Sequence, residues 1–477
     1  MNREKALIKN TIIISIGTIC TKLITFLLLP LYTRVLTTEE YGIVDLLNTL
    51  SLLLIPIITF QMEQAIFREL IEARKSEKSK TEIISNGFFS ILIQSFIFIV
   101  IFLLVSPFIK NNYKFFIVIN VIFSIFASLL LQISRGLGDN KKYSIASFIN
   151  ALITVSSNVI TLTIFHWKVN GMLLGLLLGQ VATFVYLFFS LHLSQYLSFK
   201  CANIKITKRL WKYSLPLVPN ALSWWIFGSS DRVIVSSFLG LSMNGILSAA
   251  SKFSVAYTLL YSIFDRSWIE SISLHIDDDD IEQYFNKTFN EILKMFFGIM
   301  ILMISFMPII YNVLINEKFN YGYRIVPFLM LGAFFNVVQG LVVVIYAAKK
   351  DTKSIAKTSM AAALLNIIIH FVLLKATGLY AAALSTLGAY FLISVYRFID
   401  VKHKYMNIRI NKSELITYIA TSFLVIILYY MNNSILNIVS MLLSILIALA
   451  MNRKSAMTIF NLLKNKKGRE KYVKEIY

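Results

Sequence analysis

Apolar residues recur along the chain in runs of roughly twenty, the length that a helix needs to cross the hydrocarbon core of a bilayer. Short polar segments separate these runs, and the sequence lacks the alternating ten-residue strands of a membrane barrel. The pattern predicts an all-α polytopic membrane protein of about fourteen transmembrane helices. We place the spans at 8–30, 42–62, 83–107, 114–134, 144–166, 170–192, 212–236, 240–264, 288–311, 323–347, 355–374, 378–398, 413–431 and 434–451.

Lys and Arg are distributed unevenly between the two sides of the predicted spans. With the N-terminal segment inside, the inner segments hold about five times as many basic residues as the outer ones, the bias that cytoplasmic loops show. We therefore predict that both termini lie in the cytoplasm. The first apolar run continues to Pro30 without a small-residue cleavage site, which indicates a transmembrane helix rather than a signal peptide.

The composition agrees with this class. Of the residues, 57% are hydrophobic and 15% are charged, whereas about a quarter of a soluble domain is charged. The formal net charge of +21 would suit nucleic acid, but the basic residues are spread over short loops instead of gathering on one soluble face. We therefore predict no nucleic acid partner. The two cysteines, Cys20 and Cys201, imply no disulfide framework.

Three short matches indicate an internal repeat. Residues 36–43 (LTTEEYGI) match 239–246 (LGLSMNGI) at an offset of 203, and two further pairs follow in order at offsets of 210 and 207. The offset equals six spans, an even number, so the halves share one orientation and are related by a pseudo-two-fold axis along the membrane normal. We predict two six-helix lobes, a pair of accessory helices and a basic cytoplasmic tail, at 1–200 (spans 1–6), 201–400 (spans 7–12), 401–451 (spans 13 and 14) and 452–477.

The positively charged side chains inside predicted spans include Lys22 in the first, Arg232 in the seventh and Lys252 in the eighth. A Lys or Arg at the middle of a bilayer costs about 3 kcal/mol and rarely faces lipid. We therefore expect these residues to line a water-filled cavity that holds an anion. For Arg232 and its neighbour Asp231 a structural ion pair with another helix is the alternative, because consecutive residues cannot share one helical face.

Other polar residues lie in or near the predicted spans. Asn244 and Ser248 precede the lysine of the eighth span at intervals of four and share its helical face. Asn150 belongs to an uncharged polar stripe on the fifth span, for which ordinary helix–helix packing is slightly favoured over cavity lining. Asp45, near the outer end of the second span, is a less favoured counter-ion. Lys294, near the inner end of the ninth, either joins the cavity or extends to the headgroups.

The sequence contains no catalytic or metal-binding motif. Its five histidines are scattered without a metal-ligand spacing, and no glycine-rich phosphate loop indicates ATP hydrolysis. We predict a transporter rather than an enzyme, without a cofactor. Its energy would come from an H+ or Na+ gradient, from the membrane potential or from the supply of substrate.

Four blocks resemble the polysaccharide-biosynthesis flippases, the Wzx-type exporters of O-antigen and capsule repeat units in the multidrug/oligosaccharidyl-lipid/polysaccharide exporter superfamily. The blocks, in the expected order, are FLLLPLYTRVLTTEEYGIVD (26–45), LPLVPNALSWWIFGSSDRVIVSSFLG (215–240), GYRIVPFLMLG (322–332) and NIIIHFVLLKATGLYAAALST (366–386). The resemblance implies alternating access between two lobes. It also implies that an oligosaccharide on undecaprenyl (polyprenyl) diphosphate moves from the cytoplasmic to the outer leaflet of the bacterial inner membrane.

In such families, basic residues on spans 1, 2, 7 and 8 line the central cavity, and the matching positions here are Lys22, Arg232 and Lys252. The implied partners are the lipid-linked oligosaccharide, membrane lipids and a polysaccharide polymerase, in the synthesis of lipopolysaccharide O-antigen or capsule. A lipid II-type flippase is one alternative, although span 2 lacks the mid-helix basic residue of that branch. A cation-coupled multidrug exporter of the same fold is another, and it would need an acidic cavity.

Overall fold

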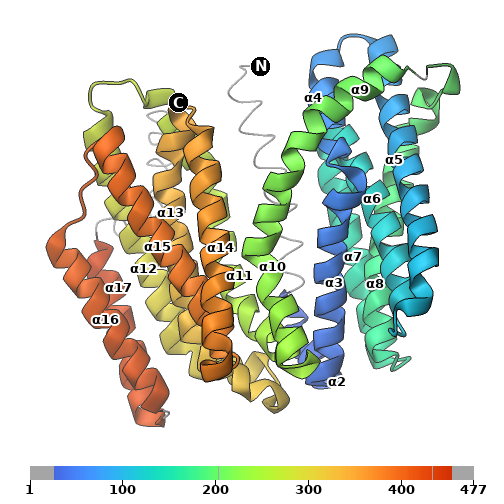
Figure 1. The fold of residues 1–477 in the computed structure, drawn as a ribbon. Coiled ribbons are helices and arrows are strands. Elements are labelled where there is room, and N and C mark those ends of the chain that lie inside the picture. The colour runs from blue at the N-terminus through green and yellow to red at the C-terminus, as the bar shows by residue number, and fades with distance from the viewer. Residues whose placement is uncertain (1–25, 202, 432, 454–477) are drawn as a thin grey trace, which may run out of the picture. The chain divides into compact units, whose positions relative to one another are not determined.

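The computed structural model describes residues 26–201, 203–431 and 433–453, which form helices joined by short loops, with no strand among them (Figure 1). The chain divides into two compact units, Met1–Ala249 (unit 1) and Ala250–Tyr477 (unit 2). Most of the predicted first span and most of the predicted basic tail lie outside the described residues.

Unit 1 consists of long helices, several short helices and the first turns of α11. In its described part α2 comes first, and α9 and η4 lie between the long helix α8 and α10. The bounds are α2 (Leu29–Val35), α3 (Thr38–Thr59), α4 (Met62–Ala73), α5 (Glu77–Val105), η1 (Ser106–Phe108), α6 (Lys114–Leu137), α7 (Asn140–Thr163), α8 (Lys168–Ser190), η2 (Leu193–Tyr196), η3 (Phe199–Cys201), α9 (Ile204–Ser214), η4 (Leu215–Leu217) and α10 (Val218–Phe238).

The ends of several helices in unit 1 follow from local chemistry. The Thr37 hydroxyl accepts a hydrogen bond from the N–H of Glu40 at 3.1 Å, and the Glu40 carboxylate accepts one from the N–H of Thr37 at 2.8 Å, which caps α3. Gly138 ends α6 at a φ of +91°, a conformation that glycine adopts without strain. Pro219 lies in the first turn of α10, where its missing N–H needs no partner.

Helices α7 and α8 pack closely because a polar stripe of α7 meets small residues of α8. A Cβ atom on Gly179 of α8 would lie 2.1 Å from the Thr154 hydroxyl oxygen of α7. The Asn150 side chain of the same stripe donates a hydrogen bond to the Thr183 hydroxyl of α8 at 3.0 Å. Small residues and interhelical hydrogen bonds of this kind hold membrane helices together. This packing is the interpretation that the sequence slightly favours for the stripe.

The hydrophobic core of unit 1 gathers around the short helix α4. Helix α4 packs against α5, α6 and α9. Its apolar face removes Ile66 and Leu70 completely from solvent, together with side chains of α5 and α6. The buried members include Met62, Ala65, Ile66 and Leu70 of α4, Ile83, Ile84 and Ile91 of α5, and Val121, Leu129, Leu130 and Ile133 of α6.

Unit 2 begins within α11, which runs on from unit 1. In unit 2, α12 packs against α13, α16 and α17, and α15 packs against α13 and α14. The bounds are α11 (Leu241–His275), α12 (Ile281–Leu314), η5 (Glu317–Ile325), α13 (Val326–Ala348), α14 (Thr352–Thr377), α15 (Tyr380–Lys404), α16 (Lys412–Met431) and α17 (Ser434–Met451).

Twelve helices of the described part are long and apolar enough to cross a membrane, so the chain is a multi-pass membrane protein. Two of the fourteen predicted spans account for the difference. Span 8–30 lies mostly outside the described residues. Helix α10, which corresponds to span 212–236, is 21 residues long, but Asp231, Arg232 and several serines lower its mean hydropathy.

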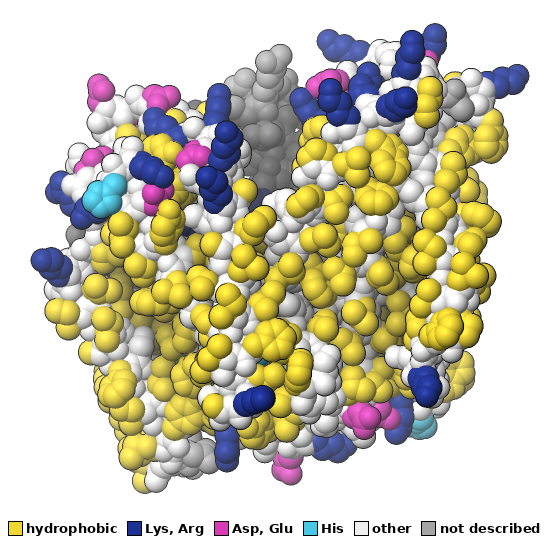
Figure 2. All heavy atoms as spheres, in the orientation of Figure 1, with side chains coloured by type: hydrophobic (Ala, Val, Ile, Leu, Met, Phe, Trp, Pro, Cys, Tyr) yellow, Lys and Arg dark blue, Asp and Glu magenta, His cyan; other side chains and the backbone are white. Residues whose placement is uncertain are grey.

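Figure 2 shows a distribution of side chains on unit 1 that suits a membrane. Hydrophobic side chains cover the sides of the unit 1 helices, and Lys and Arg gather at the end of the unit where α4 and α9 lie. Apolar helix sides face lipid at low cost, whereas long basic side chains reach the polar headgroups.

An asparagine on α5 holds the segment that leads into α9. The Asn86 amide donates hydrogen bonds to the carbonyl oxygens of Cys201 (2.9 Å) and Glu82 (2.7 Å), and its oxygen accepts one from the N–H of Asn203 (2.8 Å). Asn203 is the N-cap of α9. One side chain therefore fixes the backbone on which α9 begins.

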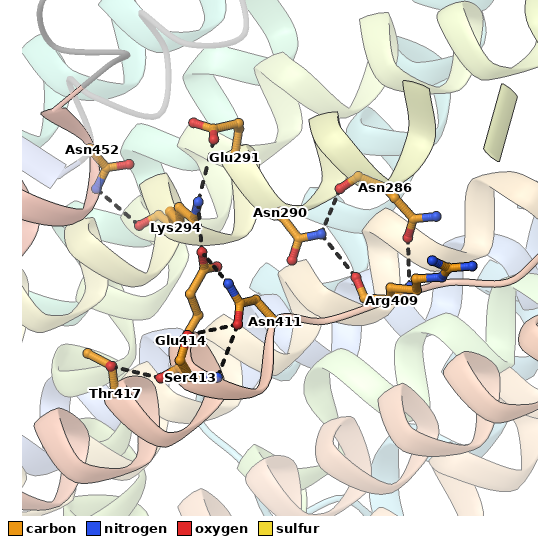
Figure 3. Close-up of polar contacts among 10 residues, drawn as sticks. All are labelled: Asn286, Asn290, Glu291, Lys294, Arg409, Asn411, Ser413, Glu414, Thr417 and Asn452. Atoms are coloured by element: carbon orange, nitrogen blue, oxygen red, sulfur yellow. Dashed lines mark hydrogen bonds and ion pairs between the residues drawn. The ribbon is translucent and has the colours of Figure 1, made fainter. Parts of the chain in front are cut away.

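Asn286 on α12 makes the corresponding contacts in unit 2. Its amide donates to the carbonyl oxygens of Asn407 (2.9 Å) and Glu282 (2.8 Å). Its oxygen accepts from the N–H of Arg409 (2.6 Å), the bond that Figure 3 draws. In both units the asparagine bonds a glutamate carbonyl one turn earlier on its own helix. It also bonds two backbone groups just before a helix that comes much later in the chain, α9 in unit 1 and α16 in unit 2. We call these two arrangements the asparagine clamps. Because they occupy equivalent places along the chain, they support the predicted repeat.

Candidate functional site

Polar side chains from three helices meet in unit 1, where α3 packs against α10 and the first turns of α11. An ion pair joins the guanidinium Nε of Arg232 on α10 to the carboxylate Oδ2 of Asp45 on α3 at 2.9 Å. The carboxylate Oδ1 accepts a hydrogen bond from the Ser248 hydroxyl of α11 at 2.7 Å. The Asn244 amide, one turn before Ser248, donates to the backbone carbonyl of Gly42 at 3.0 Å. We call Asp45, Arg232, Asn244 and Ser248 the polar cluster.

The polar cluster is largely withdrawn from solvent. Asn244 and Ser248 are fully buried, and the Asp45 side chain is 10% exposed. Burying either charge alone would be costly, so each ion stabilises the other here. The Arg232 side chain remains 20% exposed, and a guanidinium presents five donors. Arg232 can therefore contact a further anion without first leaving Asp45.

The close approach of α3 and α11 depends on two glycines. A Cβ atom on Gly42 would lie 1.9 Å from the carbonyl oxygen of Leu241, and one on Gly245 would lie 1.9 Å from the carbonyl oxygen of Thr38. Beside them, the hydroxyls of Thr38 and Ser242 form a hydrogen bond of 2.7 Å. The glycines stand at the offset of 203 that the sequence shows, so equivalent turns of the repeat face each other.

The turn between α10 and α11 places the beginning of α11 against α3. Gly240 makes this turn at a φ of +91°, in the left-handed region where only glycine is unstrained. The N-terminus of a helix carries a partial positive charge, which favours a carboxylate nearby. Asp45 bonds Ser248 in the second turn of α11. Asp45 thus contacts the beginning of α11 through Ser248 and α10 through Arg232.

The other predicted cavity residues lie at different places. Lys252 is half-buried on α11, in the part of that helix that belongs to unit 2. Asp231 is half-buried on α10, next to Arg232. Lys22 lies outside the described residues. Of the positive charges that the sequence selects, the structure thus brings Arg232 into the polar cluster, with Asp45 as its counter-ion.

Lys294 belongs to a separate polar network that joins α12 to the accessory helices (Figure 3). Its ammonium lies 2.9 Å from the Glu414 carboxylate at the start of α16 and 3.5 Å from the Glu291 carboxylate one turn back on α12. Its backbone carbonyl accepts a hydrogen bond from the Asn452 amide beyond α17 at 3.3 Å. Lys294 therefore ties both accessory helices to α12.

A buried cation in unit 2 was not selected from the sequence. Arg397 on α15 is 2% exposed, and its guanidinium donates hydrogen bonds to the hydroxyls of Thr358 (2.7 Å) and Ser359 (2.9 Å) and to the side-chain oxygen of Gln339. The sequence places it at the end of span 378–398, where a basic residue is inexpensive. Its burial arises from α13 and α14, so its position along the chain gave no signal.

The sequence model of polysaccharide biosynthesis proteins matches residues 7–269. This match covers more than half of the chain and includes the whole polar cluster. The chain belongs to the polysaccharide biosynthesis protein family. A protein of the Lsg locus of Haemophilus influenzae is 22% identical over 272 residues, which are 55% of this chain and 64% of that protein. The chain thus matches less than two thirds of the length of this curated relative.

Solved structures show that this polysaccharide biosynthesis protein has a transporter fold. The lipid II flippase MurJ in an inward closed conformation matches with a TM-score of 0.70 and 18% identity, over 95% of this chain and 100% of that one. An inward-facing multidrug resistance transporter of the MATE family and MOP superfamily matches with a TM-score of 0.65 and 12% identity, over 80% and 95%. At these identities the likeness establishes the fold alone.

Proposed function

We propose that this polysaccharide biosynthesis protein is a flippase for a polyprenyl-diphosphate-linked oligosaccharide, moved from the cytoplasmic to the outer leaflet of the bacterial inner membrane. The oligosaccharide would be the repeat unit of an O-antigen or capsule. The observation that carries the proposal is the polar cluster, in which a guanidinium, a carboxylate, an amide and a hydroxyl meet inside membrane-spanning helices. Family and fold, which are those of transporters, support it.

The head of such a lipid cannot cross hydrocarbon unaided. Each polar group that loses water without a replacement costs roughly 2–7 kcal/mol. Fixed cations, amides and hydroxyls along the helices substitute for this water, while the polyprenyl chain stays in the lipid. In this proposal Lys22, Arg232 and Lys252 attract the diphosphate, and Asn244 and Ser248 belong to the same polar path.

Asp45 gives Arg232 a counter-ion while no substrate is bound. A diphosphate carries more negative charge than one carboxylate and offers more acceptor oxygens to the guanidinium fork. It therefore competes with Asp45 for Arg232. Substrate binding would loosen α3 from α10 and so favour rearrangement of the helices around the polar cluster.

The remaining parts of the proposal concern the whole chain. Both termini would lie in the cytoplasm, as the Lys and Arg bias indicates. The lobes would be 1–200 and 201–400, a division that the paired asparagine clamps support. A polysaccharide polymerase acting at the outer leaflet is the partner that would use the product.

Reconstitution tests this function. The full chain is purified into liposomes that contain a polyprenyl-diphosphate oligosaccharide with a fluorescent headgroup, and a membrane-impermeant reductant reports headgroup exposure. We expect the wild type to expose the headgroups of the inner leaflet to the reductant. Arg232→Ala and Lys252→Ala should each slow this exposure about tenfold or more, because a lost transition-state contact of about 1.4 kcal/mol lowers a rate tenfold. Lys318→Ala, which changes an exposed lysine before α13 that is no member of the polar cluster, should leave the rate unchanged.

Three results would contradict the proposal. Wild-type rates in both cation variants would remove the site assignment. Transport of ethidium, but not of the lipid-linked oligosaccharide, would instead favour a multidrug exporter of this fold. Equal movement of lipid II in matched liposomes would favour the lipid II-type alternative. In cells, loss of surface polysaccharide from both variants at normal protein level is the expected result.

A further inference from the structure

Helix α3 and helix α4 are joined by a strained break. Phe60 and Gln61 both adopt the left-handed conformation, with φ of 48° and 59°. For residues other than glycine this conformation costs roughly 1–2 kcal/mol each. The hydrophobic pattern of the sequence predicts one uninterrupted span over 42–62. The packing of α4 against α5, α6 and α9 therefore sustains the break.

An acid is buried two residues after this break. Glu63, on the first turn of α4, is 4% exposed, and its carboxyl Oε2 has no hydrogen-bond partner among the described residues. Glu63 shares a face of α4 with Ile66 and Leu70, both fully buried in the core of unit 1. An ionised carboxylate is costly in such apolar surroundings, so the packing favours the neutral acid.

Charged groups on the surrounding helices do not compensate Glu63, because none of those described lies within ion-pair distance of it. On α4 itself, Arg68 pairs with Glu72 at 2.9 Å, and Glu69 pairs with Arg209 of α9 at 2.8 Å. Arg74, just after α4, donates to the carbonyls of Gly136 and Arg135, and the Arg135 guanidinium of α6 stacks on Phe67. The other charged residues of the helices packed against α4 or joined to it are Glu77, Lys78, Lys80 and Glu82 of α5, Lys205, Lys208 and Lys212 of α9, Lys114 at the far end of α6, and Glu39, Glu40 and Asp45 at the far end of α3.

Burial raises the pKa of the Glu63 carboxyl above its ordinary value of 4.5, and the opposing effects of its own N–H and the Thr59 hydroxyl on the pKa are smaller. The sign follows from linkage. With a raised pKa, the packed state is favoured by protonation at low pH, and this stabilisation is lost as the pH rises from 4.5 through the raised pKa. Ionisation therefore favours any state in which α4 has moved and water reaches the carboxyl.

We propose that Glu63 is a proton-binding site, and that the break at Phe60–Gln61 is the hinge on which it acts. With α4 packed, the carboxyl holds one proton. When α4 turns about the hinge and water enters, the O–H bond breaks and the proton passes to water, leaving a carboxylate. The conformational cycle thus takes up and releases one proton at Glu63. As a coupling step for lipid-linked sugar transport, this rests on the function proposed above, but the proton-dependent movement does not.

A cysteine on α4 tests the movement without any substrate. Cys20 and Cys201 are replaced by Ser, and Ala65, which is fully buried, is replaced by Cys. Maleimide labelling is measured from pH 5 to 8 and divided by the labelling rate of the unfolded chain at each pH, which removes the titration of the thiol itself. We expect the corrected rate to rise with pH, by at most about tenfold per unit because one proton is released.

The matched variants separate a proton site from a buried structural group. Glu63→Gln keeps the size of the side chain but cannot ionise, so its corrected labelling should be flat with pH. Glu72→Gln, which changes an exposed acid on the same helix, should keep the wild-type slope. Glu63→Met, apolar and of similar length, replaces the Gln variant if size-exclusion chromatography shows that the latter does not fold.

A pH slope that persists in Glu63→Gln or Glu63→Met, or that is absent from the wild type, would overturn the proposal. Transport in proteoliposomes then tests the coupling: the wild-type rate should depend on pH and that of Glu63→Gln should not. If the labelling slope depends on Glu63 but the liposomes move no lipid-linked sugar, the proton site stands and the proposed function fails.

Discussion

The contact between α3 and α11 is decided at positions where the side chain is a single hydrogen. At Gly42 a methyl group would meet a backbone oxygen 1.9 Å away, far closer than real Cβ atoms approach other atoms. A backbone oxygen cannot rotate aside as the end of a flexible side chain can. Widening this contact would also separate Asp45 from Ser248, which are hydrogen-bonded between the same two helices at 2.7 Å.

Replacing Gly42 by Ala should therefore lower the melting temperature, because overpacking a close contact costs about 1–3 kcal/mol. The matched control is Gly228→Ala on α10, where nothing lies within 4 Å of the added methyl group. It should be neutral, or stabilise by up to about 1 kcal/mol, because alanine favours a helix interior. Thermal unfolding of both purified variants in detergent measures the difference. Equal melting temperatures for the two would contradict the tight packing of α3 on α11.

The members of the polar cluster were predictable as individuals but not as a group. Arg232 stood out because a charge inside an apolar span is costly, and Asn244 and Ser248 because they share one helical face. That they meet Asp45 was not predictable. The pairing depends on how α3 and α10 are rotated about their axes, and no local pattern encodes that rotation. Asp45 also lies near a predicted span end, where an acid needs no partner.

At the scale of elements, some helix ends follow from sequence and others from packing. Pro219 and Gly240 mark the start and the end of the α10 region by residue type alone. The break at Phe60–Gln61 carries no such mark, because neither residue favours a left-handed conformation. The asparagine clamps show a third case, in which a side chain of one helix determines where a distant helix begins. Their bonds join residues more than a hundred positions apart.

The clamps should contribute alike in the two units. Asn86→Ala removes bonds to two backbone groups before α9, and Asn286→Ala removes bonds to two backbone groups before α16. Each should lower the free energy of unfolding by about 1–3 kcal/mol, because partly buried groups are left unpaired. Hydrogen exchange should show faster exchange at the N–H of Asn203 in the first variant and of Arg409 in the second. Asn112→Ala, in the exposed loop before α6, is the control and should change neither. An effect confined to one unit would argue against equivalent roles.

At the scale of the whole molecule, the membrane class and the all-helical fold were predictable because hydrophobic runs of the right length recur throughout the chain. Helix α10 shows the limit of that signal, since Asp231, Arg232 and its serines lower its apolar character, and Arg232 belongs to the polar cluster. Short matches predict a repeat, and one of their offsets, 203, relates Gly42 and Gly245, which face each other in the structure. This contact lies within unit 1, between α3 and the first turns of α11.

A disulfide can test whether this contact opens during transport. The hydroxyls of Thr38 and Ser242 lie 2.7 Å apart, so sulfur atoms at these positions can bond with little backbone movement. In a chain with Cys20 and Cys201 replaced by Ser, Thr38→Cys with Ser242→Cys should form the bond on oxidation. Under alternating access, oxidised protein in liposomes should stop exposing the lipid-linked headgroup, and a reductant should restore it. Each single cysteine variant should be insensitive to oxidation. Full transport by the cross-linked chain would show that α3 and the start of α11 stay together throughout the cycle. Substrate release would then have to occur at another place than the contact between these two helices.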